Sequence, residues 1–581
     1  MIDYTLLLEE LGKTETCRNL GRAELKELKY KFYKDSIVWE IKTEVATDGK
    51  SVDVTFFLNF PIDFPFSMPK IFISKESYEE LKYIPHINGD NSICIFDEGL
   101  NLILPTDNFA DLIELMLARA KKIIRDAENE EYKRNEFKRE FKAYWELSYS
   151  ESDLIFNQVF HSISNENDEL KGLKFINNNL GNYRYFISND DYDIKKIKEY
   201  AKECKCLVEE IGILKIDNNF FEPPFELTFE ASIEIIKKDE EKYKQFRELC
   251  NTYNFDSVLI VFTNNHNSTN EYFGWTYQNV DILTRKKGGN RHLTSKIQHL
   301  TNNVYAKRHV TRLSFDNMNL SRLQIRTAGY KEIQKSVVIS GLGSVGSNLV
   351  YFLKNLSINK FHLIDKEVLS SENIKRHLLG FSSVWNYKIE GIKKEIKNSN
   401  PLIDVQIRNK SVSTIIENEI EFINACDFHF IAIGKTMIEK YILNSIAQRK
   451  LFKPTFLFWV EPFLASGQML FIMPTDVTKA LQLIQSENYP FSILSPLKNQ
   501  LDKTYLIEGS CQTGYSPYSS TYLIQFLSAI FPYMKDHLNG KDITSKVYTW
   551  VGDKDLLAEK ELLITDFAIE RTSFQLVINN L

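Results

Sequence analysis

An apolar strand, a glycine-rich turn and an amphipathic helix follow one another in residues 336–354. The strand Val337–Ile339 leads into Gly341, Gly343 and Gly346, which are spaced G-x-G-x-x-G, and a second strand ends in Asp365, about twenty residues later. Glycines at such positions let backbone N–H groups and the helix N-terminus approach a phosphate, while the acid can bind ribose hydroxyls. This order predicts a nucleotide site on a Rossmann-like domain.

The polar residues after the second strand indicate which nucleotide is bound. Asn373 and Arg376 follow Asp365, and Lys388 lies twelve residues beyond Arg376. An amide and two cations suit a triphosphate, whereas a dehydrogenase has no use for them there. The stretch resembles the adenylation domain of ubiquitin-activating (E1) enzymes and the ThiF/MoeB family, although His377 stands where that family usually has Gln. The resemblance implies that ATP and Mg²⁺ are bound, with Asn373, Arg376 and Lys388 at the nucleotide.

The chain departs from the family pattern at the residue that usually binds magnesium, an Asp placed after the fourth strand. Here that strand reads Asp427-Phe-His-Phe-Ile-Ala-Ile-Gly434, and the expected Asp falls on Gly434. We therefore assign no metal-binding residue. Either ATP phosphates and another carboxylate hold the metal, or the adenylation activity is weakened.

The N-terminal part reads as an α+β unit. Strands are predicted at Ile37–Thr43 and Asp53–Leu58, and an amphipathic helix at Phe109–Ala127. Between them, three prolines at positions 61, 65 and 69 exclude a helix and force an extended, turning path. Cys94 follows on an irregular loop. A cysteine between two isoleucines is often a small buried apolar residue, so this pattern alone leaves its role open.

This unit resembles the ubiquitin-conjugating (E2) fold. Its segment Phe64-Pro-Phe-Ser-Met-Pro-Lys70 is similar to the Tyr-Pro-Phe-x-Pro-Pro segment of that family, and Asn91-Ser-Ile-Cys94-Ile is similar to Gly-x-Ile-Cys-Leu. His86-Ile-Asn88 is similar to the His-Pro-Asn motif, but it lacks the proline and lies two residues closer to the cysteine. The resemblance implies that Cys94 carries an acyl group as a thioester, which stays reactive toward amines, and that His86 belongs to the same site.

The charged stretch 125–151 is predicted to form a solvated helix that spaces the first unit from the next. Residues 151–315 show predicted strands near Leu173–Ile176, Arg184–Ser188 and Ser257–Phe262, and predicted helices near Tyr192–Cys204 and Glu230–Thr252, without a catalytic constellation. We interpret the chain as a multidomain α/β and α+β protein with an E2-like domain at 1–150, an α/β linker domain at 151–315 and an adenylation domain at 316–581.

The E1 resemblance assigns two further residues. Leu320–Arg326 resembles the helix before the glycine turn of MoeB-like proteins, which implies a homodimer in which Arg322 reaches the partner subunit's ATP site. Cys511 lies in a Gly/Ser-rich loop before the predicted helix Tyr522–Met534, where a helix N-terminus favours a thiolate. The resemblance implies that Cys511 takes the acyl group from the adenylate, whereas its rival Cys426 reads as a core residue.

Composition argues against several other classes of protein. With 26% charged residues and a formal net charge of −6, the chain lacks the basic character expected of a nucleic-acid-binding protein. No apolar run approaches the roughly 18 residues of a membrane span, and the N-terminus does not read as a secretion signal. Seven scattered cysteines without a pair of C-x-x-C motifs suit a reducing cytoplasm and predict no structural zinc.

The order of the two active units resembles the fused E2–E1 proteins of the bacterial anti-phage operons known as CBASS. The resemblance implies that ATP activates the C-terminus of a partner protein, a CD-NTase-type cyclic-nucleotide synthase, and that the acyl group passes through Cys511 and Cys94 to a lysine amine of an unknown acceptor. Two alternatives stay open. One is a sulfur-carrier-protein adenylyltransferase for cofactor synthesis, and the other is a non-catalytic scaffold, which Gly434 and the altered His-Ile-Asn motif favour.

Overall fold

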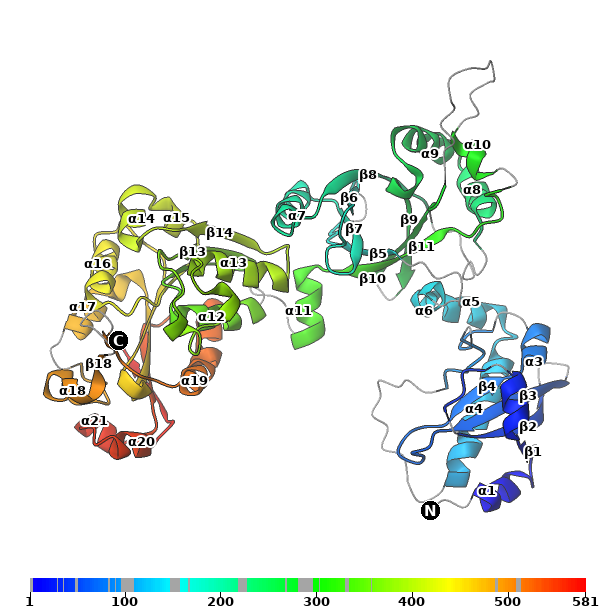
Figure 1. Ribbon diagram of the computed structural model, residues 1–581, viewed down its shortest axis with the longest axis horizontal. Coiled ribbons are helices and arrows are strands. Elements are labelled where there is room, and N and C mark those ends of the chain that lie inside the picture. The colour runs from blue at the N-terminus through cyan, green and yellow to red at the C-terminus, as the bar shows by residue number, and fades with distance from the viewer. Residues whose placement is uncertain are drawn as a thin grey trace. The chain divides into compact units, whose positions relative to one another are not determined.

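The computed structural model of the protein describes residues 4–28, 30–34, 36–46, 51–81, 84–88, 90–95, 109–146, 157–165, 168–217, 227–266, 269–280, 296–301, 304–329, 334–356, 358–485, 489–507 and 514–581. The chain divides into two compact units (Figure 1). The first comprises Met1–His161, Asn167–Asn189 and Cys206–Asp316, and the second comprises Ser162–Glu166, Asp190–Lys205 and Asn317–Leu581.

The N-terminal part of the first unit is an antiparallel meander with helices packed on it. Its strands are β1 (Thr16–Asn19), β2 (Ile37–Ala46), β3 (Ser51–Phe60) and β4 (Lys70–Ile73), and its helices are α1 (Tyr4–Leu11), α2 (Arg22–Leu28), α3 (Lys75–Glu80) and α4 (Phe109–Asp126). Helix α4 buries a stripe with the period of an α-helix, formed by Leu112, Ile113, Met116, Leu117, Ala120 and Ile124. This stripe joins α1 and the sheet in one core, which confirms the predicted α+β unit.

The charged stretch after α4 is helical, as predicted, but it is not a solvated spacer throughout, and that part of the prediction was wrong. It forms α5 (Glu130–Arg139) and α6 (Phe141–Glu146), in which Phe141 and Trp145 are buried. Both rings pack on Phe262 and Phe273 of the barrel described next, with ring centroids 4.7 to 6.1 Å apart. A spacing of four residues puts the two aromatic side chains on one helix face, and the charged residues around them conceal this stripe in the sequence.

The rest of the first unit is a closed barrel with the strand order β10-β11-β5-β7-β6-β8-β9. Its strands are β5 (Asn157–His161), β6 (Lys171–Phe175), β7 (Tyr183–Ser188), β8 (Val208–Lys215), β9 (Val258–His266), β10 (Thr269–Thr276) and β11 (Thr311–Asn317), and its helices are α8 (Phe229–Lys237), α9 (Glu240–Thr252) and α10 (Lys296–Leu300). The single helix predicted at Glu230–Thr252 is two helices, because the Asp239 side chain accepts the N–H of Lys242 and caps a new start.

Helix α7 (Asp191–Glu203) belongs to the second unit. There Tyr200 Oη donates to Asn398 Oδ1 at 2.8 Å, and Glu203 pairs with Lys393 at 2.7 Å. The segment interpreted as a linker domain is therefore divided between the two units.

The second unit is built on a sheet with the order β14-β13-β12-β15-β16-β17-β20-β21. Strands β12 (Ser336–Ser340), β13 (Lys360–Ile364), β14 (Asp404–Arg408), β15 (Phe428–Ile431) and β16 (Thr455–Val460) pair in parallel, and β17 (Ser466–Ile472), β20 (Lys546–Val551) and β21 (Leu576–Asn580) extend the sheet antiparallel. A short ribbon, β18 (Leu506–Ile507) and β19 (Gly514–Tyr515), stands apart from it.

Helices cover both faces of this sheet (Figure 1). One face packs on α12 (Ser344–Asn355), α13 (Lys388–Ser399) and α19 (Ser520–Leu538), and the other on α14 (Val412–Asn418), α15 (Glu421–Asn424), α16 (Thr436–Ala447) and α17 (Val477–Gln485). Shorter or peripheral helices are α11 (Leu320–Ala328), α18 (Leu501–Thr504), α20 (Lys554–Glu559) and α21 (Asp566–Ile569). The predicted Rossmann-like domain is confirmed.

The chain leaves β12 toward β13 on one side and returns to β15 on the other side. In such a doubly wound sheet, ligands bind in the crevice at the carboxyl ends of the two strands where the order reverses. Gly341 follows β12 and Ala432 follows β15, so the predicted nucleotide turn lies at this crevice. No helix in the described part of the chain is long and apolar enough to cross a membrane.

Candidate functional site

The glycines of the turn are required by close backbone contacts. Gly341 has φ +91°, and a Cβ added to it would lie 2.6 Å from the carbonyl oxygen of Ala432. A Cβ on Gly346 would lie 1.9 Å from the carbonyl oxygen of Gly341. Helix α12 begins after Gly343, which supplies no side-chain cap. The N–H groups of its first turn therefore face the crevice as donors for a phosphate.

Asp365 lies at the end of β13 and lines a cavity beside the turn, together with Gly341, Gly343 and Glu367. Its Oδ2 accepts the N–H of Leu342 at 2.6 Å, and its Oδ1 accepts the N–H of Glu367 at 2.7 Å. Burial raises the pKa of this carboxyl. Each carboxylate oxygen has a second lone pair, so Asp365 can still accept a ribose hydroxyl while it holds the turn in place.

Arg376 is held beside α12 by its own backbone. The Ser344 hydroxyl and the Asn348 amide both donate to its carbonyl oxygen at 2.9 Å. Its guanidinium lies 4.5 Å from the ring centroid of Tyr518 and donates to Asn373 Oδ1 at 3.3 Å. The structure thus brings Asn373 and Arg376 to the helix N-terminus that the sequence predicts as the phosphate site.

Lys388 is buried, and its Nζ lies 2.7 Å from Glu367 Oε2, which keeps the pKa of Glu367 low. Glu367 lines the same cavity as Asp365. Lys388 therefore acts on this cavity indirectly, by its ion pair with Glu367. Lys435, which no sequence motif marks, also lines the cavity, and its Nζ lies 3.7 Å from Glu367. Arg322 lies on α11, where its guanidinium donates to the carbonyl of Asn317 at 2.9 Å.

His377, which stands where the ThiF/MoeB family usually has Gln, stabilises the glycine turn by hydrogen bonds. One ring nitrogen, Nε2, lies 2.7 Å from the carbonyl oxygen of Leu342, and Nδ1 accepts the N–H of Leu379 at 3.0 Å. Nε2 therefore carries the proton of a neutral ring. Burial lowers the pKa of His377 to about 4.

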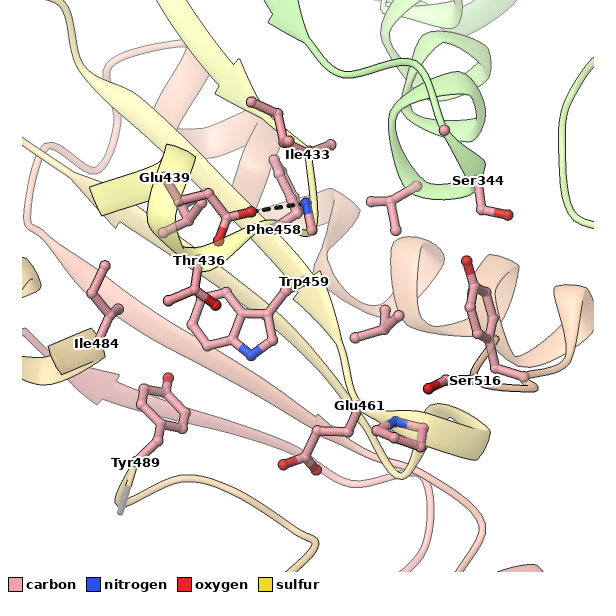
Figure 2. Close-up of a pocket in the computed structure, with 18 of the residues that line it drawn as sticks. Ser344, Ile433, Thr436, Glu439, Phe458, Trp459, Glu461, Ile484, Tyr489 and Ser516 are labelled. Atoms are coloured by element: carbon pink, nitrogen blue, oxygen red, sulfur yellow. Dashed lines mark hydrogen bonds between the residues drawn. The ribbon is translucent and has the colours of Figure 1, made fainter. Parts of the chain in front are cut away.

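A carboxylate reaches the strand end where the expected magnesium ligand is missing. Glu439, in the first turns of α16, turns back so that its Oε1 accepts the N–H of Gly434 at 2.9 Å (Figure 2). The side chain is buried, and burial raises its pKa. Carboxylate oxygen is the ligand type that Mg²⁺ prefers, so Glu439 fits the role that the sequence leaves without a residue.

A second cavity, of about 550 Å³, adjoins the nucleotide cavity. The two share Gly343, Ala432 and Ile433. Figure 2 shows Ser344 and Ser516 around one part of the larger cavity and Trp459, Glu461 and Tyr489 around another. No sequence motif marks these residues at the strand end after β16.

In the first unit, Cys94 lies in a short paired segment beside β4. Its N–H donates to the carbonyl oxygen of His86 at 2.8 Å, and Ile87 bridges Ile93. Ser92 in turn forms a β-bridge with Phe72 of β4, so the segment that contains Cys94 lies beside the edge strand of the sheet. Cys94 is exposed, which contradicts the reading as a buried apolar residue.

The His86 side chain lies between two carboxylates. Its Nε2 is 3.2 Å from Glu136 Oε2 and its Nδ1 is 3.1 Å from Glu140 Oε1, while its backbone N–H donates to Tyr144 Oη. Burial lowers the pKa of His86, but the hydrogen bond and charge of Glu140 and the charge of Glu136 outweigh burial and raise it overall. With both ring nitrogens on carboxylates, His86 acts on Cys94 by holding its backbone.

The other predicted thiol, Cys511, lies outside the described residues. Its rival Cys426 is buried, and burial raises the pKa of its thiol to about 12. A thiol with so high a pKa is a poor nucleophile at neutral pH, which agrees with the prediction that Cys426 is a core residue.

Two protein families match the parts of the sequence that form these sites. The ThiF family matches residues 317–525, which contain the glycine turn and both cavities, and Prokaryotic E2 family B matches residues 23–154, which contain Cys94. The chain joins a prokaryotic E2 family B domain to a ThiF family domain. This fused E2–E1 architecture agrees with the resemblance found in the sequence.

Similar proteins match parts of the chain. A probable molybdopterin-synthase adenylyltransferase of Porphyra purpurea is 30% identical over 106 residues, which are 18% of this chain and 27% of that protein. The match thus spans little more than a quarter of the relative. Among solved structures, PaaA aligns at 16% identity and a TM-score of 0.30, covering 43% of this chain and 73% of PaaA. Escherichia coli MccB with MccA-N7isoASN aligns at 14% identity and a TM-score of 0.29, covering 45% and 66%.

Proposed function

We propose that the ThiF family domain transfers AMP from ATP to the C-terminal carboxylate of a partner protein. One observation carries this proposal: the nucleotide cavity and the 550 Å³ cavity meet at Gly343, Ala432 and Ile433, directly at the N-terminus of α12. A nucleotide in the first cavity presents its phosphates to this junction. A polypeptide tail in the second cavity brings its carboxylate to the same place.

In the proposed first step, a carboxylate oxygen of the partner attacks the α-phosphorus of ATP, and the bond to pyrophosphate breaks. Arg376 and the uncapped N–H groups of α12 stabilise the negative charge that develops on the phosphate oxygens. Asp365 binds the ribose and Lys388 keeps Glu367 ionised and in place. Mg²⁺, when bound, neutralises phosphate charge, and Glu439 is the residue of this chain that would hold it.

In the later steps the acyl group moves between thiols. The Cys511 thiolate attacks the acyl carbon and AMP leaves; the Cys94 thiolate then displaces Cys511. A lysine amine of the acceptor attacks the Cys94 thioester, and the thiol leaves as an amide forms. The exposure of Cys94 within the prokaryotic E2 family B domain supports the second exchange, and the place of Cys511 in the sequence supports the first.

We infer the class of partner from the order of the domains. The E2–E1 order supports a CD-NTase-type cyclic-nucleotide synthase as the activated protein, in an anti-phage role. The exposed position of Arg322 on α11 is compatible with a homodimer in which this residue serves the partner subunit's ATP site.

Exchange of radiolabelled pyrophosphate into ATP tests the proposal. The purified chain, Mg²⁺ and a candidate partner with a free C-terminus should give exchange, and the same partner lacking its last residues should not. Exchange that is equal with both partners would contradict activation of a C-terminus. Mass spectrometry of a complete reaction then identifies the lysine that receives the partner.

A second candidate, adenylation of a sulfur-carrier protein, is favoured by the similarity to the molybdopterin-synthase adenylyltransferase. In that case a separate sulfide-level donor attacks the acyl-adenylate, AMP leaves and a thiocarboxylate forms, so that Cys94 has no role. Formation of a thiocarboxylate by the Cys94→Ala variant at the normal rate would support this candidate against conjugation.

A further inference from the structure

The larger cavity of the ThiF family domain is acidic and aromatic. Two carboxylates, Glu439 and Glu461, line it, and no Lys, Arg or His is present among the described residues of its lining. Aromatic rings from Phe458, Trp459, Tyr489 and Tyr518 also line it, and the Arg376 guanidinium already lies over the ring of Tyr518. Ring faces are partially negative, so such a wall favours a cation over an anion or an apolar group.

Glu439 and Glu461 serve different parts of this cavity. Glu439 faces the shared junction with the nucleotide cavity, where its Oε1 accepts the N–H of Gly434. Glu461 follows the end of β16 and, in Figure 2, lies toward Tyr489, away from Ser344. The requirement of the phosphates for a metal therefore gives Glu439 a ligand-binding role, whereas it gives none to Glu461.

Glu461 is fixed in place before any ligand arrives. Its Oε2 accepts the backbone N–H groups of Ile493 and Leu494 at 3.1 and 3.3 Å. Trp459, two residues earlier and within β16, packs edge to face on Tyr489 with ring centroids 5.2 Å apart. A carboxylate and an aromatic pair held in this way lose little conformational freedom when a ligand binds.

The electrostatics of this corner favour a positively charged ligand. Burial raises the pKa of Glu461, and the charge of Glu461 contributes to the raised pKa of Tyr489. An arriving cation offsets the cost of keeping this carboxylate charged away from water, whereas an acidic group adds to that cost. An apolar side chain adds no opposite charge to the hydrogen bonds that this carboxylate already accepts from the Ile493 and Leu494 N–H groups.

We propose that Glu461, Trp459 and Tyr489 form a subsite for a lysine or arginine side chain near the C-terminus of the activated polypeptide. The inference rests on the proposed function, because the tail enters this cavity only if its carboxylate is the group that is activated. The terminal residue lies at the junction with the nucleotide cavity, and a residue before it places its side chain on Glu461. The subsite thus selects partners by one basic residue of the tail.

Synthetic peptides test the subsite without knowledge of the natural partner. The probes are pools of ten-residue peptides with a free C-terminus, in which one of the last six positions is fixed as Lys, Arg, norleucine, Gln or Glu and the others are mixed. Each pool is assayed with the full-length protein for pyrophosphate exchange into ATP, and C-terminally amidated pools set the background. Norleucine matches the apolar stem of lysine without its charge.

We expect Lys or Arg at one position to raise exchange at least about tenfold over norleucine, the size expected of a charged hydrogen bond. Glu461→Gln keeps an oxygen for the Ile493 and Leu494 N–H groups and should lower that ratio to near one. Glu461→Lys should shift the preference to Glu at the same position. Trp459→Leu should weaken the preference, and Glu559→Gln, at an exposed glutamate of α20, should leave it unchanged.

Different results contradict the subsite and the proposed function. Exchange well above the amidated background, but equal for basic, norleucine and acidic pools, overturns the subsite and leaves the proposed function standing. A basic preference that persists in Glu461→Gln, with an unchanged thermal unfolding midpoint, also overturns it. Exchange at background with every pool contradicts activation of a C-terminus and, with it, the subsite.

Discussion

The carboxylate of Glu439 accepts a hydrogen bond from the backbone N–H of Gly434, with 2.9 Å between Oε1 and the nitrogen. Gly434 stands where the resembling family carries its magnesium ligand, and Glu439 comes from the following helix. Glu439, five positions after Gly434, thus places a carboxylate at this strand end. This relationship weakens the hypothesis of a non-catalytic scaffold, which rested in part on Gly434.

Replacement of Glu439 tests whether this carboxylate holds magnesium. In Glu439→Gln, we expect the Mg²⁺ concentration for half-maximal pyrophosphate exchange to rise about tenfold or more, because a neutral amide is a weaker ligand than a carboxylate. The stabilisation of the protein by ATP in a thermal melt should likewise need more Mg²⁺. An unchanged Mg²⁺ dependence in both measurements would assign Glu439 to the support of Gly434 alone.

Arg376 is expected to stabilise the transition state of adenylation. Arg376→Ala should lower partner-dependent exchange by at least about 100-fold, the loss typical for removal of one preorganised donor. Arg376→Lys should recover little of it, because lysine lacks the planar group that packs on Tyr518 and bonds Asn373. Lys375→Ala, at the exposed neighbouring position, is the control. Normal exchange in Arg376→Ala would rule out the phosphate site as placed.

The two thiols are expected to fail at different steps. Both Cys94→Ala and Cys511→Ala should keep pyrophosphate exchange, since adenylate formation needs no thiol. Cys511→Ala should load no thioester, whereas Cys94→Ala should form a DTT-sensitive adduct with the partner yet no amide product. Non-reducing gels show both adducts, and Cys204→Ser, at another exposed cysteine, is the control. Charging of Cys94 in Cys511→Ala, or normal conjugation by Cys94→Ala, contradicts the sequence of transfers.

A mixture of the two thiol variants tests the expected dimer. Restored amide formation would mean that the acyl group passes from Cys511 of one chain to Cys94 of another. Conjugation by neither variant alone, and none in the mixture, would place the transfer within one chain.

The ion pairs of His86 beside Cys94 predict that the folded protein loses stability at alkaline pH. Because the folded pKa of His86 is raised, the stability that this histidine contributes is fully present below its unfolded pKa, near 6.5, and is lost as pH rises through the folded pKa. His86→Asn keeps a residue that tolerates the observed φ of +67°. The stability advantage of the native chain over this variant should shrink between pH 6 and pH 9 in thermal melts. An advantage independent of pH would exclude a charged His86.

Buried neutral histidines predict destabilisation by acid. Burial lowers the pKa of His429 to about 3, and its Nε2 lies 2.8 Å from Ser340 Oγ between β12 and β15. A histidine with a lowered folded pKa contributes stability above its unfolded pKa, and loses about 1.4 kcal/mol per pH unit below 6.5. His429→Gln should therefore flatten the fall in unfolding midpoint between pH 6.5 and 5. An equally steep fall in this variant would assign the acid sensitivity to other groups.

Parts of the fold were predictable because their causes are local. The glycine turn requires residues at fixed short spacings, and the apolar stripe of α4 follows from the period of one helix. Aromatic residues of α6 were missed, since their partners Phe262 and Phe273 lie more than a hundred positions away and the surrounding charges suggested a solvated surface. His86 was found by its motif, but its two carboxylate partners were not.

The amino-acid sequence by itself determined the two kinds of domain, the nucleotide turn with Asp365 and Arg376, and the candidate thiols, because each depends on neighbours along the chain. Only the tertiary structure decided that Glu439 turns back to Gly434 and that Trp459, Glu461 and Tyr489 surround one cavity. Their distances follow from the order of strands around β12 and from the loops at the strand ends. Side chains that are brought together by the order of strands in a sheet have no fixed spacing in the sequence. No periodicity or motif therefore predicts that they lie close together.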